Sequence, residues 1–235
     1  MKKKIIFAIV LLACTLPTFS QNVQLHFDPR RGLHSDDFNR NYLTATFEMF
    51  KPDKWGSTFM FVDLDFNQTK GNLGLAYMEI ARDQKIGNLP VMAHIEYNGG
   101  LVRDEAFNGF SIPNAYLAGA SYATNIVGVN LSTYIAYKYH AFDRVSNDVQ
   151  WTFTWSRNFC DGKITLSGFF DLWTENKNRF KGNGESGKKI VVLTEPQFWY
   201  NVTSSLSLGT EVEISDNFLQ DKTYVNPTIA AKWNF

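Results

Sequence analysis

The stretch VQWTFTWSR, residues 149–157, alternates apolar and polar side chains over most of its length. Its apolar parity holds Val149, Trp151, Phe153 and Trp155, and its polar parity holds Gln150, Thr152, Thr154 and Ser156. Successive side chains of a β-strand point to opposite faces of the sheet. The stretch therefore predicts a strand with one apolar face and one polar face.

The same alternation recurs along the chain in runs that turn-rich segments separate. Twelve such runs are found, at residues 22–28, 41–50, 55–66, 70–82, 89–101, 112–124, 126–139, 147–158, 162–174, 188–200, 204–215 and 224–235. Connections after odd-numbered runs tend to be longer than those after even-numbered runs, as in PRRGLHSDDFNR against KPDK. Membrane barrels combine short periplasmic turns with longer extracellular loops. The pattern predicts an all-β, antiparallel 12-stranded transmembrane β-barrel.

The N-terminal segment MKKKIIFAIVLLACTLPTFSQ has a lysine-rich start, an apolar run and small or polar residues near its end. This order is typical of an export signal. We expect residues 1–20 to be the signal peptide and residues 21–235 to form the barrel. The alternative is a lipobox, LLAC, with a lipidated Cys14, but the TLPTF that follows is not the polar tether of a lipoprotein.

Composition argues against several classes of function. Removal of the three signal lysines would leave 20 basic residues (23 − 3) against 23 acidic ones, a net charge of −3. No basic field then argues for a nucleic-acid partner. Cys160 would be the single remaining cysteine, so no intramolecular disulfide is expected. Two acids two positions apart are a weak metal signal, and we expect no metal or cofactor.

Periodicity alone fits a soluble barrel with an apolar interior as well as a membrane barrel with an apolar exterior. Aromatic residues near the ends of the runs favour the membrane barrel, because aromatic girdles mark the bilayer surfaces. The chain ends in VNPTIAAKWNF, which resembles the C-terminal strand signal that the barrel-assembly machinery reads at a terminal aromatic residue, here Phe235. We expect the outer membrane of a Gram-negative bacterium, with a soluble all-β protein as the alternative.

Two prolines, Pro196 and Pro227, lie inside runs. A proline has no N–H to give to a strand ladder, and a closed barrel has no free edge where that loss is harmless. We expect a bulge or a lost ladder hydrogen bond near each.

In a membrane barrel the polar parity of each run lines the lumen. Within GSTFMFVDLDF, residues 56–66, the inward residues are Phe59, Phe61, Asp63 and Asp65. The other runs add the inward candidates Tyr77, Glu79, Glu96, Asp171, Trp173, Glu195 and Trp199. Aromatic side chains stack on flat rings, and carboxylates accept hydrogen bonds from ring N–H groups and sugar hydroxyls. The inward residues therefore predict a site for nucleosides or similar small solutes.

Five segments resemble a known family: FEMFKPDKWGSTFMFVDLDF, GLAYMEIARD, HIEYNGGL, SGFFDLWTE and LTEPQFWYNV. They are similar to small exported barrels grouped with the Tsx-like, nucleoside-specific channel-forming proteins of the bacterial outer membrane. The resemblance covers nearly the whole mature chain. It implies a monomeric twelve-stranded barrel that passes nucleosides down a gradient. In that barrel Phe59 and Phe61 would stack on the solute, and Asp63 and Asp65 would be polar contacts.

Two other functions stay open. Inward acids could pair with Arg82, Lys138 or Arg103, and Phe59 and Phe61 could plug a non-conducting structural barrel. Some twelve-stranded outer-membrane barrels are lipid hydrolases, which need a serine nucleophile beside a histidine base. No motif places a serine beside any of the four histidines, which are His26, His34, His94 and His140. We expect a channel and not an enzyme.

Overall fold

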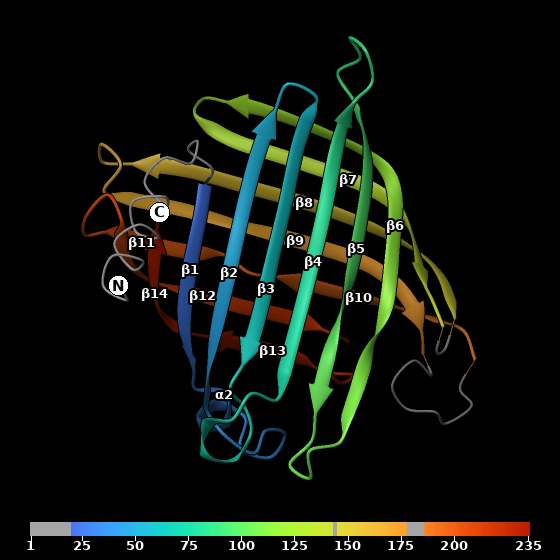
Figure 1. The fold of residues 1–235 in the computed structure, drawn as a ribbon, viewed down its shortest axis with the longest axis vertical. Coiled ribbons are helices and arrows are strands. Elements are labelled where there is room, and N and C mark those ends of the chain that lie inside the picture. The colour runs from blue at the N-terminus through green and yellow to red at the C-terminus, as the bar shows by residue number, and fades with distance from the viewer. Residues whose placement is uncertain (1–19, 143–144, 178–185) are drawn as a thin grey trace, which may run out of the picture.

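The computed structural model describes residues 20–142, 145–177 and 186–235. The expected signal peptide lies outside these residues except for its last position. The elements are β1 (Ser20–Asp28), α2 (Arg30–Leu33), β2 (Tyr42–Asp53), β3 (Gly56–Asp65), η1 (Thr69–Gly71), β4 (Leu75–Lys85), β5 (Met92–Arg103), β6 (Gly109–Ile126), β7 (Val129–His140), β8 (Ser146–Phe159), β9 (Ile164–Asn176), β10 (Lys188–Thr194), β11 (Gln197–Asn201), β12 (Leu206–Asp216), β13 (Thr223–Pro227) and β14 (Ile229–Asn234). Strands dominate the described chain (Figure 1).

The strands form one closed antiparallel sheet. Consecutive strands from β1 to β9 pair with each other, and β1 also pairs with β14, which joins the first strand to the last. In the described residues β10 and β11 both pair with β9 and β12, and β13 and β14 both pair with β12. Each of these two sets is therefore one interrupted crossing, and the described strands make the expected twelve-stranded barrel.

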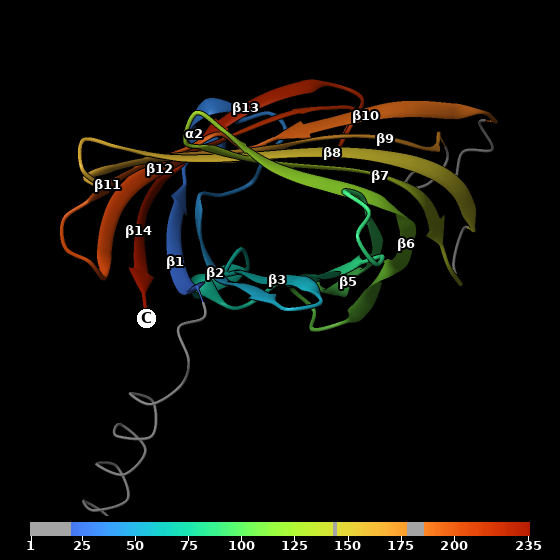
Figure 2. The ribbon, with the colours of Figure 1, turned by 90° about the horizontal axis from the view of Figure 1, so that it is seen from above.

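Seen from above, the barrel has two walls that face each other (Figure 2). We call β2–β5 the front wall and β7–β10 the back wall. The two walls come from separate parts of the chain, residues 42–103 and residues 129–194.

The two interrupted crossings coincide with the two prolines. The ladder stops at Thr194 and resumes at Gln197, on either side of Pro196, and it stops at Pro227 and resumes at Ile229. Pairing register is the same on both sides of each break, since Thr194 pairs with Phe170 and Gln197 pairs with Ser167. The expected loss of ladder hydrogen bonds is confirmed, and no extra residue is inserted at either break.

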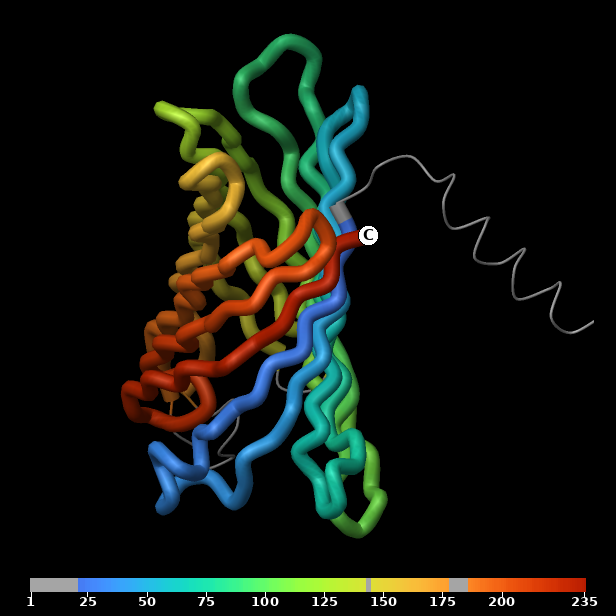
Figure 3. The backbone as a smooth tube through the Cα atoms, turned by 90° about the vertical axis from the view of Figure 1, so that its left-hand side faces the viewer, coloured from blue at the N-terminus to red at the C-terminus, as the bar shows by residue number. Residues whose placement is uncertain are grey.

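The longest connections lie at one end of the barrel and the shortest at the other, although the six-residue connection 86–91 is at the short-turn end (Figure 3). One end carries the connections 29–41 and 66–74, of thirteen and nine residues, and the other carries 54–55, 127–128, 160–163 and 202–205. The two-residue turn has Val127 and Gly128 at φ values of 50° and 79°, as a tight hairpin turn requires. The C-terminus lies at the short-turn end, as the two termini of an even-stranded barrel should share one side.

The apolar parity faces outward and the polar parity faces inward. Trp151 is 42% exposed, whereas its neighbours Gln150 and Thr152 are 3% and 6% exposed. Along β1, the buried side chains are likewise polar and the exposed ones apolar. A soluble barrel shows the reverse arrangement, so the structure is that of a membrane barrel. No helix in the described residues is long and apolar enough to cross a membrane.

Cys160 allows a direct test of which end faces the cell exterior, because it is exposed in the turn at 160–163. On intact cells a bulky, membrane-impermeant maleimide should leave Cys160 unmodified until the outer membrane is permeabilised. In a Cys160→Ser background, Asn72→Cys places a thiol in the 66–74 loop, and the same reagent should modify it without permeabilisation. These results would place the short-turn end in the periplasm and the long-loop end outside the cell. Labelling of Cys160 with protection of position 72 would contradict this orientation.

Candidate functional site

The candidate site is the polar interior of the barrel. By register, the eleven residues singled out from the sequence all occupy inward positions. On β3, for example, Phe61 pairs with Glu48 of β2 and Glu79 of β4, and Asp63 pairs with Thr46 and Tyr77. Glu195 lies in the break between β10 and β11 and continues the parity of Gln197. Their role toward a solute stays a prediction.

An aromatic row runs along the front wall. The ring centroids of Phe59 and Phe61 lie 6.1 Å apart, and those of Phe61 and Tyr77 lie 6.0 Å apart. The rings are tilted by 50° and 54° to each other. All three side chains are half-buried, so part of each ring remains accessible from the interior. The three rings form one aromatic row on the inward face of the front wall.

Two inward aspartates, Asp63 and Asp65, follow the aromatic residues along β3. Thr46 donates its hydroxyl to Oδ1 of Asp63 at 2.5 Å, and Thr44 donates to Oδ1 of Asp65 at 2.6 Å. Each threonine occupies one acceptor oxygen, and a carboxylate offers two. Both aspartates are half-buried and so keep acceptor capacity toward the interior.

The two inward tryptophans have a different environment. Trp199 is 0% exposed and Trp173 is 5% exposed. The ammonium of Lys232 lies 4.0 Å from the ring centroid of Trp199, and that of Lys138 lies 4.6 Å from the ring of Trp173. Such cation–π contacts cover the ring faces. The tryptophans therefore pack the barrel wall and present little surface to a solute.

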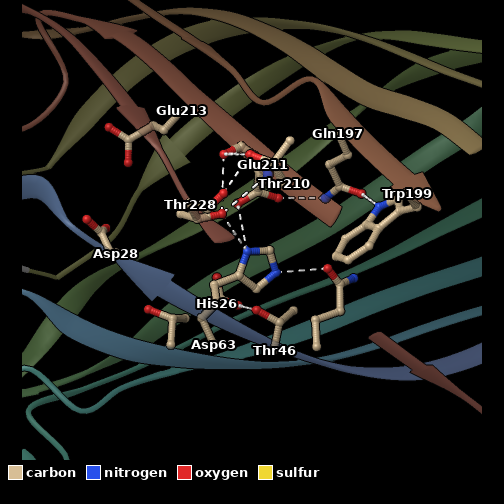
Figure 4. Close-up of polar contacts among 12 residues, drawn as sticks. His26, Asp28, Thr46, Asp63, Gln197, Trp199, Thr210, Glu211, Glu213 and Thr228 are labelled. Atoms are coloured by element: carbon tan, nitrogen blue, oxygen red, sulfur yellow. Dashed lines mark hydrogen bonds and ion pairs between the residues drawn. The ribbon is translucent and has the colours of Figure 1, made fainter. Parts of the chain in front are cut away.

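Strand β1 adds inward residues that the sequence analysis did not single out, namely Asn22, Gln24, His26 and Asp28. Figure 4 shows the His26 ring directed at Thr228, with Trp199 nearby. Nδ1 of His26 lies 3.0 Å from Oγ1 of Thr228, and Nε2 lies 3.0 Å from Oε1 of Gln24. The alternation in NVQLHFD predicts their inward orientation, but C-terminal partners such as Thr228, between β13 and β14, become neighbours only when the ring closes.

The bases proposed as structural partners of the inward acids do not all face inward. Arg82 pairs with Thr58, on the outward parity of β3, and binds Asp53 at 2.6 Å near the short-turn end. It is therefore not a partner of Glu79. Lys138 does face inward, where it donates to Oε1 of Gln150 at 2.6 Å.

The loop 29–41 covers the edge of β13 at the long-loop end. Nε2 of His34 lies 3.3 Å from the carbonyl oxygen of Val225, and the ring of His34 packs edge-on against Tyr224 at 5.1 Å. Arg30 extends into the barrel mouth and binds Asp28 at 2.6 Å and Glu213 at 3.3 Å. An edge strand left bare would offer unpaired backbone groups, so the loop completes the barrel where β1 ends.

An exposed ion pair fastens this loop, since Nζ of Lys222 lies 2.9 Å from Oδ1 of Asp37. The hydrogen bond from Lys222 holds the pKa of Asp37 below its ordinary value, so the contribution is present at neutral pH and is lost only as pH falls through that lowered pKa. We expect Asp37→Asn to speed tryptic cleavage after Arg31 by a factor of about 2–5, because exposed pairs contribute little. Asp36→Asn is the control, and equal rates in both variants would contradict the fastening role.

Comparison with known proteins places the chain in a family. The model of the family described as "Domain of unknown function (DUF5020)" matches residues 20–235. The chain belongs to the DUF5020 family. This match leaves the Tsx-like grouping of the DUF5020 barrel unconfirmed. No curated protein sequence matches the chain.

Solved structures resemble the DUF5020 barrel in fold. A structure described as the NanC porin has a TM-score of 0.57 at 10% identity, and the match covers 92% of this chain and 100% of that chain. LpxR from Salmonella typhimurium matches with a TM-score of 0.48 at 8% identity, over 92% and 100% of the two chains. A loop-deletion variant of OmpT from Vibrio cholerae gives 0.45 at 9%, over 92% and 98%. At such identities the NanC likeness shows the fold alone.

Among the described residues of the DUF5020 barrel, a serine, a histidine and an aspartate come together in two clusters, but not in the order of a hydrolytic triad. Oγ of Ser121 donates to Asp83 at 2.6 Å, and Nδ1 of His94 contacts the same carboxylate at 2.8 Å. Ser146 and His140 likewise both contact Asp148. A hydrolytic triad needs the serine on the histidine ring. In both clusters the aspartate lies between them, which gives no support to the hydrolase alternative.

Proposed function

We propose that this DUF5020 protein is an outer-membrane channel for the passive, selective diffusion of nucleosides or similar small solutes. One observation carries the proposal: the accessible row of Phe59, Phe61 and Tyr77 lies beside the half-buried carboxylates of Asp63 and Asp65. A general porin gains nothing from large inward aromatic rings. A solute with a flat ring and several donors gains stacking from the row and hydrogen bonds from the carboxylates.

The mechanism is physical and involves no bond making. A solute passes the loops at the long-loop end, exchanges part of its hydration shell for weak contacts along the front wall, and leaves at the short-turn end. Several weak sites in series allow passage, whereas one tight site would trap the solute. The channel needs no cofactor.

Outside its lumen, the barrel would contact membrane lipid and the assembly machinery. The outward apolar side chains would contact outer-membrane lipid in a Gram-negative cell, and the barrel would act as a monomer. The terminal Phe235 would be read by the barrel-assembly machinery. Its backbone N–H donates to the carbonyl oxygen of Gln21 at 3.1 Å, so the residue belongs to the closing seam of the barrel while its side chain stays exposed.

The proposal is tested by single-channel recording of the purified protein in planar bilayers. We expect discrete conductance steps that added nucleosides reduce in a concentration-dependent manner, while a disaccharide has a weaker effect. Absence of conductance under all conditions would contradict the channel and favour a structural barrel with a plugged lumen. Conductance that no nucleoside reduces would contradict the substrate class only.

A further inference from the structure

Three inward carboxylates converge from opposite walls of the barrel. Glu79 on β4 and Glu96 on β5 are diagonal neighbours on the front wall, because Glu79 pairs with Asn98. Asp171 lies on β9 in the back wall, and a chain of hydrogen bonds through Tyr134, Gln150 and Thr152 connects it to Glu96. Like charges at close range repel strongly when they are shielded from water. We call Glu79, Glu96 and Asp171 the carboxylate cluster.

Neutral hydroxyl groups supply hydrogen bonds to the cluster without balancing its charge. Tyr77 donates to Oε1 of Glu79 at 2.6 Å, and Thr152 donates to Oδ1 of Asp171 at 2.5 Å. Tyr134 donates to Oε2 of Glu96 at 3.0 Å. These contacts orient the three carboxylates toward the interior and leave most of their charge to be compensated by something else.

The bases near the cluster are already engaged. His94 contacts Glu96 through Nε2 at 3.2 Å and Asp83 through Nδ1 at 2.8 Å, so its ring is also engaged by an acid outside the cluster. The charge of Lys138 acts on Glu79 and Asp171, but its ammonium donates to Gln150 and lies over the ring of Trp173. The three acids of the cluster thus have two bases nearby, Lys138 and a histidine that also contacts Asp83.

One carboxylate oxygen of the cluster has no hydrogen-bond partner among the described residues. This atom is Oε1 of Glu96, a residue that is 7% exposed. Buried polar atoms are almost always paired, and an unpaired charged oxygen is costly. Oε2 of the same carboxylate holds both of its protein partners, so Oε1 is the atom left for a ligand.

The aromatic surroundings define which kind of cation fits. Tyr77 and Phe61 stand beside Glu79, and the Tyr134 ring stacks on His94 with centroids 3.9 Å apart. Carboxylates beside aromatic faces suit an organic ammonium group, which gains charge pairing, hydrogen bonds and cation–π contact together. No group of three or more described acidic, histidine or cysteine side chains is close enough to hold a bare metal ion.

We propose that the carboxylate cluster is a subsite for the ammonium group of cationic solutes, and that it makes the channel cation-selective. The second part rests on the proposed channel function, and the first part does not. A primary ammonium would donate to Oε1 of Glu96 and pair with Glu79 and Asp171. The subsite lies on the path of the nucleoside proposal and extends it to solutes that carry an amine.

Binding is tested without conduction, by NMR line broadening of carbon-13-labelled methylammonium added to the protein in detergent micelles. We expect broadening with the wild type that excess unlabelled methylammonium reverses. The combined variant Glu79→Gln, Glu96→Gln, Asp171→Asn should lose it, while Asp161→Asn, an exposed turn acid with φ 54°, should keep it. Heat-modifiable gel mobility verifies that each variant folds. Broadening that is absent in the wild type, or equal in wild type and combined variant, would overturn the subsite.

Selectivity is tested by reversal potentials in a KCl gradient across planar bilayers. We expect the wild type to prefer K⁺ over Cl⁻, and the combined variant to lose this preference by a factor of about 3 or more. Conduction without cation preference would overturn the inference and leave the channel proposal intact. Absence of any conduction would instead overturn the channel proposal, and the NMR result would still decide whether the subsite binds an ammonium group.

Discussion

Replacement of Phe61 by Ala is expected to weaken nucleoside block of the channel by a factor of about 5–150, which corresponds to the ~1–3 kcal/mol that stacking on one base contributes. Phe61 is the central ring of the row, with Phe59 at 6.1 Å and Tyr77 at 6.0 Å. Its loss divides the aromatic surface into two separate rings. The measurement is the nucleoside concentration that halves the single-channel current.

The matched control is Phe198→Ala. Phe198 lies on the outward face of β11 and is exposed there, so this variant removes the same atoms from the lipid-facing surface. It should leave block unchanged. Phe61→Tyr keeps a ring at the position and should retain most of the block. If Phe61→Ala and Phe198→Ala behave alike, the aromatic row does not contact the solute.

Replacement of Gly209 by Ala is expected to destabilise the barrel by about 3 kcal/mol, at the upper end of the usual cost of overpacking, or to prevent assembly. Gly209 pairs with Trp199 across the β11–β12 ladder. An added Cβ would lie 2.1 Å from the carbonyl oxygen of Phe198 and 2.7 Å from Cε3 of Trp199. Backbone and a fully buried indole ring have little room to move.

The control is Gly109→Ala, because an added Cβ at Gly109 meets no atom within 4 Å. Urea unfolding followed by heat-modifiable gel mobility compares the two variants with the wild type. Gly109→Ala should unfold near the wild-type midpoint, and Gly209→Ala should unfold at much lower urea or fail to fold. Equal midpoints for both variants would show that the packing of Trp199 is looser than the structure indicates.

The barrel could be predicted from the sequence because its main signal is local. Alternation in residues 149–157 assigns each side chain to a face with no knowledge of its partners, and the same holds for Asp63 and Asp65 on β3. Pro196 and Pro227 predict the two breaks in the strand ladder, because the missing N–H is a property of proline itself. These features depend on neighbours in the chain only.

The environment of the inward residues could not be predicted, because it depends on ring closure. Trp199 and Phe61 share an inward parity, yet Trp199 is buried by Lys232 of β14, and Phe61 remains accessible. His26 meets Thr228 across 202 positions of sequence. The docking of Arg30 on Glu213 likewise requires a loop to fold over the barrel mouth. Parity decides which face a side chain occupies, and only the closed ring decides what covers it.

The central claim is that the barrel is an open channel selective for nucleosides, and liposome swelling tests it most directly. Liposomes containing the purified protein are placed in iso-osmotic solutions of a nucleoside, a disaccharide or an amino acid, and the initial swelling rates are compared with those of protein-free liposomes. The channel predicts swelling that is fastest in the nucleoside and slower in Phe61→Ala liposomes. Swelling no faster than in protein-free liposomes, with every solute, would contradict it.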